Sequence, residues 1–358
     1  MAQQAVQGIA GELPARDRAD VGRLGAYQMS KGIPVGDRPN AMTTGRYAMC
    51  GAELSVRHSP TPLQEHPVQR DPHAGPTPAD DVPEQQPPGT EGELKPRADH
   101  GEDSYRGCGK LEGLAAIING GDSGIGRAVA IAFAREGADV AVGYEADKED
   151  ADARETERWV EKAGRRCLLH RFDVREPEQC RDFVERARKE FGRLDVLVNN
   201  AAYQCEQDRL EDITAEQLER TFRTNIFGYI QMAQAALPHF EAGAVIVNTG
   251  SVTALEGNDG LIDYAATKGA IHTFTKSLAA SVADRGIRVN CVAPGPVWTP
   301  LIPATLDPAH VQKFGSDTHW ERPAQPAELA PAYVFFASGD SRYCTGEVLA
   351  ITGKTTTR

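Results

Sequence analysis

Leu114-Ala-Ala-Ile-Ile-Asn-Gly-Gly-Asp-Ser-Gly-Ile-Gly126 sets the architecture of this 358-residue chain. Its apolar first half has the pattern of a buried strand, and a helix of small residues follows from Ile125. The glycines between them occupy a strand-to-helix turn, where a helix N-terminus can bind an anion such as a pyrophosphate. In this interpretation Gly120 permits the tight turn, Gly124 lets the backbone approach a ligand, and Gly126 allows close helix packing. Taken alone, the same glycines could also serve an ordinary turn.

Beyond this turn, apolar runs of strand length alternate with helical segments. We expect strands near residues 114–119, 138–144, 167–173, 194–199, 244–249, 287–293 and 347–352. We expect helices near residues 125–136, 147–163, 177–191, 215–237, 264–284 and 327–338. Strict alternation is typical of the α/β class and predicts a Rossmann-like, doubly wound parallel sheet of seven strands with helices on both faces. Ligands of such a sheet bind above the carboxyl ends of its strands.

The first hundred residues differ in composition from the rest. They hold 13 of the 23 prolines and include Asp80-Asp-Val-Pro-Glu-Gln-Gln-Pro-Pro88. Such a stretch buries too little apolar surface to offset the conformational entropy lost on folding. We therefore predict a mostly disordered extension over residues 1–106, followed by a single Rossmann-fold catalytic domain over residues 107–358.

Charge and cysteine usage exclude several classes of protein. The net charge is −12, and neither the first hundred residues nor the rest is basic, which argues against nucleic acid or a membrane surface as a partner. The seven cysteines lack any Cys-x-x-Cys, and the histidines show no metal-ligand spacing, so we expect reduced thiols and no metal site. No signal pattern or long apolar run is present, which predicts a cytoplasmic protein.

Tyr264-Ala-Ala-Thr-Lys268 carries the chemistry, together with Ser251 upstream. Positions i and i+4 share one face of a helix, so the phenol and the ammonium can enter one pocket side by side. A free phenol titrates near pH 10, and we expect the positive charge of Lys268 to lower that value. Ser251 follows the apolar run Ala244-Val-Ile-Val247, which places its hydroxyl at a strand end, where it can orient a substrate oxygen. The combination indicates nicotinamide-dependent redox chemistry with Tyr264 as general acid and base.

Five motifs occur in a recognisable order: Gly120-x-x-x-Gly124-x-Gly126, Asn199-Asn-Ala-Ala202, Ser251, Tyr264-x-x-x-Lys268 and Pro294-Gly-Pro-Val-Trp-Thr299. Over residues 110–358 the chain resembles the short-chain dehydrogenase/reductase family. Within it, the chain is similar to a subgroup of bacterial aldehyde or alcohol reductases and plant glucose/ribitol dehydrogenase homologues. Members of that subgroup carry a Pro/Gln-rich N-terminal arm similar to residues 60–110.

The resemblance implies roles for individual residues. The implied cofactor-binding residues are Gly120, Ser123, Gly124, Ile125, Gly126, Glu145, Asp173, Val174, Asn199, Ala201, Tyr264, Lys268, Pro294, Gly295, Val297 and Thr299. The implied catalytic residues are Asn225, Ser251, Tyr264 and Lys268. Among them, Asp173 and Val174 would contact adenine, Asn199 would border the adenosine ribose, and Asn225 would kink its helix and hold a water leading to Lys268.

The choice between NAD and NADP stays open in the sequence. Tyr144 occupies the position of the usual ribose-binding acid, and Glu145 follows one residue later. Glu145 could accept from the 2′-hydroxyl of NAD or face solvent, whereas Lys148 could meet a 2′-phosphate. Three positions depart from the family pattern: Asn119 replaces a threonine, Gly250 a frequent serine, and Lys354 a glycine.

The expected function is an NAD(P)-dependent oxidoreductase that acts on a small aldehyde, ketone or alcohol. A sugar or polyol dehydrogenase is the alternative within enzymes, and a cofactor-binding stress or regulatory protein is the alternative outside them. An enoyl reductase would space its tyrosine and lysine more widely. The resemblance further implies a homotetramer or dimer formed through the helices at 215–237 and 264–284.

Overall fold

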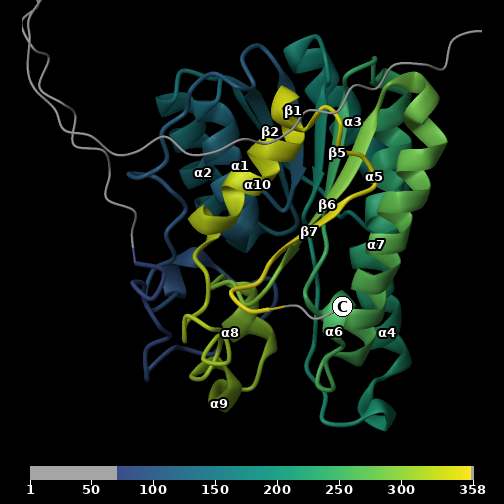
Figure 1. Ribbon diagram of the computed structural model, residues 1–358. Helices are drawn as coiled ribbons and strands as arrows, with labels where there is room; N and C mark the ends of the chain where they lie inside the picture. Colours follow the sequence, from purple (N-terminus) through teal and green to yellow (C-terminus); the bar gives the residue numbers. More distant parts are fainter. Residues whose placement is uncertain (1–70, 356–358) are drawn as a thin grey trace, which may run out of the picture. The chain divides into compact units, whose positions relative to one another are not determined.

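The computed structural model describes residues 71–355, and its centre is a seven-stranded, all-parallel sheet (Figure 1). The strand order is β3-β2-β1-β4-β5-β6-β7. The strands are β1 (Ala115–Asn119), β2 (Asp139–Tyr144), β3 (Cys167–Arg171), β4 (Val196–Asn199), β5 (Val245–Thr249), β6 (Arg288–Pro294) and β7 (Val348–Ile351). The predicted doubly wound fold is confirmed. Its strand order reverses between β1 and β4, where such folds bind their ligands.

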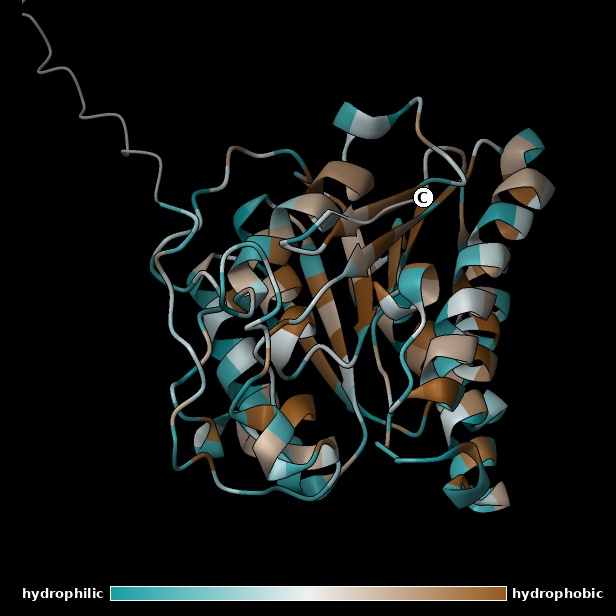
Figure 2. Ribbon diagram, turned by 60° about the horizontal axis from the view of Figure 1, so that its bottom comes forward, coloured by the Kyte–Doolittle hydropathy of each residue, from teal (hydrophilic) through white to brown (hydrophobic). Residues whose placement is uncertain are grey.

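Helices cover both faces of the sheet (Figure 1). One face packs against α1 (Gly124–Arg135), α2 (Asp150–Lys162) and α10 (Pro326–Ala337). The other packs against α3 (Pro177–Phe191), α5 (Gly228–Ala236) and α7 (Ile262–Val282). Successive residues of β1 alternate between the two cores: Ile117 joins one and Ile118 the other. Figure 2 shows the result, apolar strands enclosed by helices of mixed polar and apolar composition.

The helix predicted over 215–237 is interrupted. It consists of α4 (Ala215–Phe222), one π-helical turn (Arg223–Phe227), α5 and a short 3-10 helix (Leu237–His239). Three short helices were not expected from the sequence: α6 (Thr253–Glu256), α8 (Leu301–Thr305) and α9 (Pro308–Val311). Each has four or five residues, too few for a hydrophobic period to be recognised.

Residues 71–106 are mainly irregular, with one 3-10 helix, η1 (Glu91–Glu93), yet they pack against the sheet domain. Leu94 is buried in a small apolar cluster with Trp298, Ile302 and Val311. This part of the predicted extension is therefore more ordered than its composition indicated, while residues 1–70 lie outside the described residues. None of the helices within 71–355 is long and apolar enough to span a membrane.

Candidate active site

A cavity of about 500 Å³ opens above the carboxyl ends of β1, β2, β4, β5 and β6. Its size is within the range of small-molecule and cofactor sites. Most of the predicted site residues line it: Gly120, Ser123, Gly124, Ile125, Glu145, Asp173, Val174, Ala201, Ser251, Tyr264, Lys268, Pro294, Gly295, Val297 and Thr299. Gly126, Asn199 and Asn225 do not.

The glycine loop has the backbone that its sequence requires. Gly120 and Gly124 have φ values of +66° and +50°, a region that residues with side chains rarely adopt. A Cβ on Gly126 would lie 1.8 Å from the carbonyl oxygen of Gly120, so only glycine lets α1 start this close to the loop. The loop thus leaves an open cradle at the N-terminus of α1, where a dinucleotide's pyrophosphate fits.

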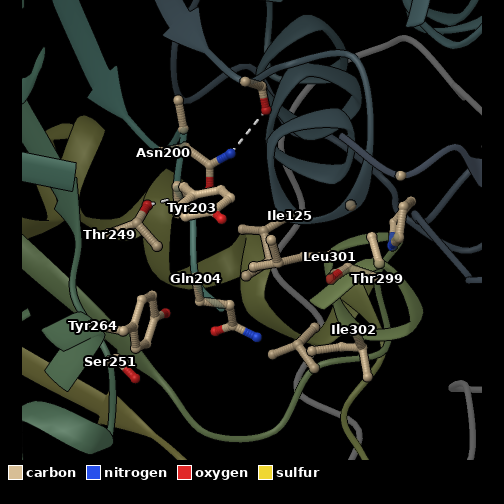
Figure 3. Close-up of a pocket in the computed structure, with 18 of the residues that line it drawn as sticks. Ile125, Asn200, Tyr203, Gln204, Thr249, Ser251, Tyr264, Thr299, Leu301 and Ile302 are labelled. Carbon is tan, nitrogen blue, oxygen red and sulfur yellow. Dashed lines mark hydrogen bonds between the residues drawn. The ribbon is translucent and has the colours of Figure 1, made fainter. Parts of the chain in front are cut away.

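Asparagines join the ends of β1, β4 and β5 beneath this loop. The Oδ1 atom of Asn119 accepts from the backbone N–H groups of Asn200 and Ala201 at 2.7 and 2.8 Å. Asn199 is fully buried, and its Nδ2 atom donates to Oδ1 of Asn248. Asn199 therefore holds strands together and does not border the pocket. Asn200 lines it instead and donates to the carbonyl oxygen of Gly120 at 2.8 Å (Figure 3).

The chemical end of the cavity holds Tyr264, Ser251 and Lys268. Tyr264 and Lys268 extend from the same face of α7, and Ser251 lies just beyond the end of β5, next to the Tyr264 ring (Figure 3). The backbone N–H and hydroxyl of Thr253 donate to Oγ of Ser251 at 3.1 and 3.0 Å, which leaves the Ser251 proton for Tyr264 or a substrate oxygen.

The pKa values of this pair differ from the sequence-based expectation. Burial raises the pKa of Tyr264 to about 12, although its contact with the Ser251 hydroxyl acts in the opposite direction. Burial likewise lowers the pKa of Lys268 to about 8. The Lys268 Nζ atom lies 5.3 Å from the centre of the Tyr264 ring and donates to the carbonyl oxygen of Thr249 at 2.9 Å. Desolvation is thus the main cause of both shifts, and it disfavours the charged form of each group.

Asn225 lies in the π-helical turn between α4 and α5, consistent with the predicted kink. Its side-chain amide is bound on both sides: Oδ1 accepts from the N–H of Tyr203, and Nδ2 donates to the carbonyl oxygen of Tyr203 and to Oγ1 of Thr267. Asn225 therefore ties the segment after β4 to α7, the helix that carries Tyr264 and Lys268. The water-holding role remains a prediction.

Gly250 is explained by its neighbours. A Cβ at this position would lie 2.3 Å from Nε2 of His272 and 2.7 Å from Sγ of Cys291. His272 is one helical turn beyond Lys268, and burial, together with Lys268 and Lys276, lowers its pKa to about 4. A neutral imidazole thus fills the space behind Lys268 that the family's serine would need.

The opposite end of the cavity is rich in carboxylates. Glu145 accepts from Nη2 of Arg175 at 2.8 Å, and the same guanidinium binds Asp173. Glu149 also lines the cavity and accepts from the N–H groups of Glu145 and Ala146 at 3.0 and 2.7 Å. Burial and the nearby Asp122 raise the pKa of Glu149 to about 8. The Lys148 Nζ atom turns away from these groups and donates to the carbonyl oxygen of Gln86.

Several lining residues were not among the predicted site residues. Tyr203, Gln204, Leu301 and Ile302 line the cavity (Figure 3), and Pro87, Pro88 and Gly89 reach it from the N-terminal region. Tyr203 and Gln204 directly follow the Asn199-Asn-Ala-Ala202 motif, so their proximity could have been inferred. The prolines and Gly89 lie in a segment whose composition suggested only disorder.

Comparisons with known proteins agree with this geometry. The family model described as enoyl-(acyl carrier protein) reductase matches residues 120–353. The chain is 53% identical over 266 residues to the uncharacterized oxidoreductase YhdF of Bacillus subtilis, covering 74% of this chain and 91% of the relative. It is 47% identical to a glucose and ribitol dehydrogenase of Daucus carota, covering 73% and 91%. It is 46% identical to the NADPH-dependent aldehyde reductase 1 of Arabidopsis thaliana, covering 73% and 93%.

Solved structures give the same result. A short chain dehydrogenase from Burkholderia cenocepacia in complex with NADP is similar with a TM-score of 0.64 and 34% identity, covering 68% of this chain and 98% of that one. A short chain dehydrogenase from Mycobacterium paratuberculosis bound to NAD has a TM-score of 0.63 and 29% identity, covering 69% and 99%. Both forms of the dinucleotide thus occur among structures that share this fold.

Proposed function

The chain belongs to the short-chain dehydrogenase/reductase family, and we propose that this NAD(P)-dependent oxidoreductase acts on a small aldehyde, ketone or alcohol with Tyr264 as its general acid and base. One observation carries the proposal. The Tyr264 phenol is buried in the cavity beside Ser251, and Lys268 lies one helical turn away. Phenol, hydroxyl and ammonium are the groups that proton transfer to a carbonyl oxygen needs.

In the proposed mechanism a dinucleotide held by the glycine loop and by the segment with Val297 and Thr299 would supply or accept the hydride at the substrate carbon. Ser251 donates to the substrate oxygen and fixes its position. Tyr264 gives its proton to that oxygen during reduction and takes it back during alcohol oxidation. Lys268 keeps positive charge close to the phenol, so that the phenolate is less unfavourable when it forms. A hydroxyl with a pKa near 12 holds its proton at neutral pH, which suits the reductive direction.

The apolar walls of the cavity favour a substrate with an apolar body. Leu261, Leu301, Ile302, Leu306 and Phe314 line the cavity. Their side chains offer little to a polyhydroxylated molecule, because each hydroxyl buried without a partner costs about 1–3 kcal/mol. A short aliphatic or aromatic aldehyde or ketone meets this surface without that cost.

A sugar or polyol dehydrogenase is the second candidate. Gln204, Asn258 and His310 also line the cavity and could bind hydroxyl groups. The similarity to the carrot glucose and ribitol dehydrogenase favours it as well. A cofactor-binding stress or regulatory protein without turnover is less consistent with this site, because binding alone does not need Ser251, Tyr264 and Lys268 together.

Purified protein should be assayed for oxidation of NADH and NADPH with short aldehydes and ketones, and for reduction of NAD and NADP with glucose, ribitol and short alcohols. Turnover with carbonyl compounds supports the first proposal, and turnover with glucose or ribitol alone supports the second. Binding of the dinucleotide without turnover on any of these compounds would favour the regulatory alternative.

Three further proposals accompany the catalytic one. We propose that residues 107–358 form the catalytic domain, that the protein is cytoplasmic, and that it assembles into a homodimer or homotetramer. Support for assembly comes from exposed apolar side chains on and near the long helices, among them Leu218, Phe227 and Ile262. Light scattering after size exclusion measures the number of subunits directly.

A further inference from the structure

Residues 85–102, which we call the strap, cross the cofactor end of the domain. We propose that the strap is an integral part of the dinucleotide site, and that Glu91 is a positioning residue for the glycine loop. Pro87, Pro88 and Gly89 form part of the cavity wall beside Ser123 and Gly124. This inference rests on the proposed function, because it assumes that the cavity holds a nicotinamide dinucleotide.

Glu91 connects the strap to the glycine loop. Its side chain is buried, and Oε1 accepts from the backbone N–H of Gly124, the first residue of α1, at 2.7 Å. Its own N–H donates to Oδ2 of Asp152 on α2 at 2.9 Å. Glu91 itself does not line the cavity, whereas its partner Gly124 does. Glu91 can therefore fix the position of the loop without occupying the space of the ligand.

A buried cluster of charges holds Glu91 in place. Nε2 of His100 lies 2.8 Å from Oε1 of Glu91, and Nδ1 of His100 lies 3.1 Å from Oε1 of Glu102. Arg127, on the first turn of α1, donates to Oδ1 of Asp152 at 3.1 Å and to the carbonyl oxygen of Asp122 in the glycine loop at 2.9 Å. The strap, the loop, α1 and α2 thus share one network of charge-assisted hydrogen bonds.

The strap also binds the opposite wall of the cavity. The N–H of Gln85 donates to the carbonyl oxygen of Pro303 at 3.0 Å, and Nε1 of Trp298 donates to the carbonyl oxygen of Pro96 at 2.7 Å. Gly89 packs so closely on Pro300 that a Cβ would lie 2.3 Å from the Pro300 carbonyl oxygen. In Figure 1 this N-terminal segment runs beside α8, which follows Pro300.

These contacts make the strap a brace between two loops that the dinucleotide must contact together. The glycine loop would hold the pyrophosphate, and the segment with Val297 and Thr299 would hold the nicotinamide end. Thr299 lies close to Gly124, since a Cβ built on that glycine would lie 3.0 Å from Cγ2 of Thr299. Loosening the strap should therefore change the separation of the loops and weaken dinucleotide binding, while leaving Tyr264, Ser251 and Lys268 in place.

Two pairs of variants of the full-length protein test this inference. In the first pair, Gly89→Ala adds a methyl group that pushes against Pro300, whereas Gly92→Ala, three residues on, has no atom within 4 Å of its new Cβ. In the second pair, Glu91→Ala removes the acceptor for Gly124, whereas Glu93→Ala alters an exposed carboxylate of the same 3-10 helix. Glu91→Gln keeps an acceptor oxygen and serves as the conservative variant.

Dissociation constants for NAD and NADP are measured by titration, folding is checked by circular dichroism, and kcat and KM are measured with a turned-over substrate. We expect Gly89→Ala and Glu91→Ala to raise the dissociation constant and the cofactor KM about tenfold or more, because overpacking of a close contact and loss of a hydrogen bond to a charged group each change an equilibrium constant by about this factor. At saturating cofactor kcat should stay close to that of the wild type. Glu91→Gln should recover most of the lost affinity, and both controls should match the wild type.

The inference is overturned if Glu91→Ala and Gly89→Ala bind the dinucleotide as tightly as the wild type, including the case in which they only unfold at a lower temperature. It is also overturned if Glu91→Ala lowers kcat and leaves the cofactor KM unchanged. If the wild type itself binds neither NAD nor NADP, the proposed function fails, a result that the variants cannot produce.

Discussion

The two ends of the cavity are built by different physical means. The chemical end rests on one long helix, α7, and on the end of β5, and the states of its ionisable groups are set by burial. The adenosine end is assembled from the glycine loop, the segment after β2, the end of β3 and the strap, and its charges are arranged in pairs and networks such as Glu145 with Arg175. The catalytic groups thus lie close together in the sequence, whereas the residues that would bind the dinucleotide come from segments far apart in the sequence.

This difference predicts where substitutions act. A change at the chemical end should affect turnover through a single group, and its effect should be large. A change at the adenosine end should affect affinity for the dinucleotide and selectivity between NAD and NADP. Its effect should be smaller, because several neighbouring residues contribute to binding. Four substitutions test this division, from the largest expected effect to the smallest.

Replacing Tyr264 by phenylalanine keeps the ring and deletes the proton donor. Turnover should fall at least about 100-fold, the lower range for a positioned general acid, while the dissociation constant of the cofactor changes little. Steady-state kinetics and cofactor titration measure the two quantities. Near-normal turnover of Tyr264→Phe would refute the proposed role of the phenol. Tyr343→Phe, at a fully exposed tyrosine, is the control.

Lys268→Met should reduce both turnover and cofactor affinity, by roughly tenfold or more in kcat/KM, because the methionine fills the space without the charge. In the wild type, kcat/KM for carbonyl reduction should fall as the pH rises through about 8, where Lys268 loses its proton, and this limb should be missing in the variant. Lys276→Met, on the exposed face of the same helix, should retain the limb. A pH profile unchanged by Lys268→Met would assign the limb to another group.

Glu145→Ala tests selectivity at the adenosine end. Removing this carboxylate should improve NADP binding relative to NAD by about tenfold, because a negative charge disfavours the 2′-phosphate and Arg175 loses one of its partners. Titrations of both cofactors give the ratio of dissociation constants. Glu161→Ala, exposed on α2, should leave the ratio unchanged. The same ratio in Glu145→Ala and the wild type would mean that Glu145 takes no part in the choice of cofactor.

His100→Gln should lower stability in a pH-dependent way. Burial opposes protonation of His100 and Arg127 repels it, but Glu91 and Glu102 raise its pKa above the ordinary value of 6.5. The stabilisation is therefore complete below pH 6.5 and is lost as the pH rises through the raised pKa; each tenfold gain in proton affinity on folding contributes about 1.4 kcal/mol. Urea unfolding at several pH values measures the free energy of unfolding, and the values for wild type and His100→Gln should converge in alkaline solution. The control His73→Gln, at an exposed site, should have no pH-dependent difference from the wild type. A pH-independent difference would contradict this charge pairing.

The sequence predicted the sheet and the catalytic groups because their signals are local. Apolar runs locate each strand to within a few residues, and the four-residue spacing of Tyr264 and Lys268 is itself helix geometry. It did not distinguish Asn199 from Asn200, since adjacent residues at a strand end point in opposite directions and only the register decides which one faces the pocket. The sequence also did not predict the lowered pKa of Lys268, because that value depends on how completely the folded chain excludes water from the ammonium group.

The strap was beyond sequence reasoning for a different reason. Its anchors are largely backbone carbonyls, such as those of Pro96 and Asp99, which every sequence contains. Its one buried carboxylate, Glu91, lies in a polar, proline-rich stretch that resembles a disordered segment. Composition measures how much apolar surface a segment can bury, and it does not register the hydrogen bonds that the segment makes to distant residues.

The strap also has a consequence for the order of folding. The N–H of Asp99 donates to Oε1 of Gln325, 226 residues later, and Pro96 accepts from Trp298 across 202 residues. During synthesis at about 5–20 residues per second, the strap therefore waits on the order of 10 to 50 s for its partners to leave the ribosome. Closing so long a loop also makes its docking slow compared with local pairing. The first part of this pocket to be translated therefore cannot dock until the segment that holds Trp298 and Gln325 has been made.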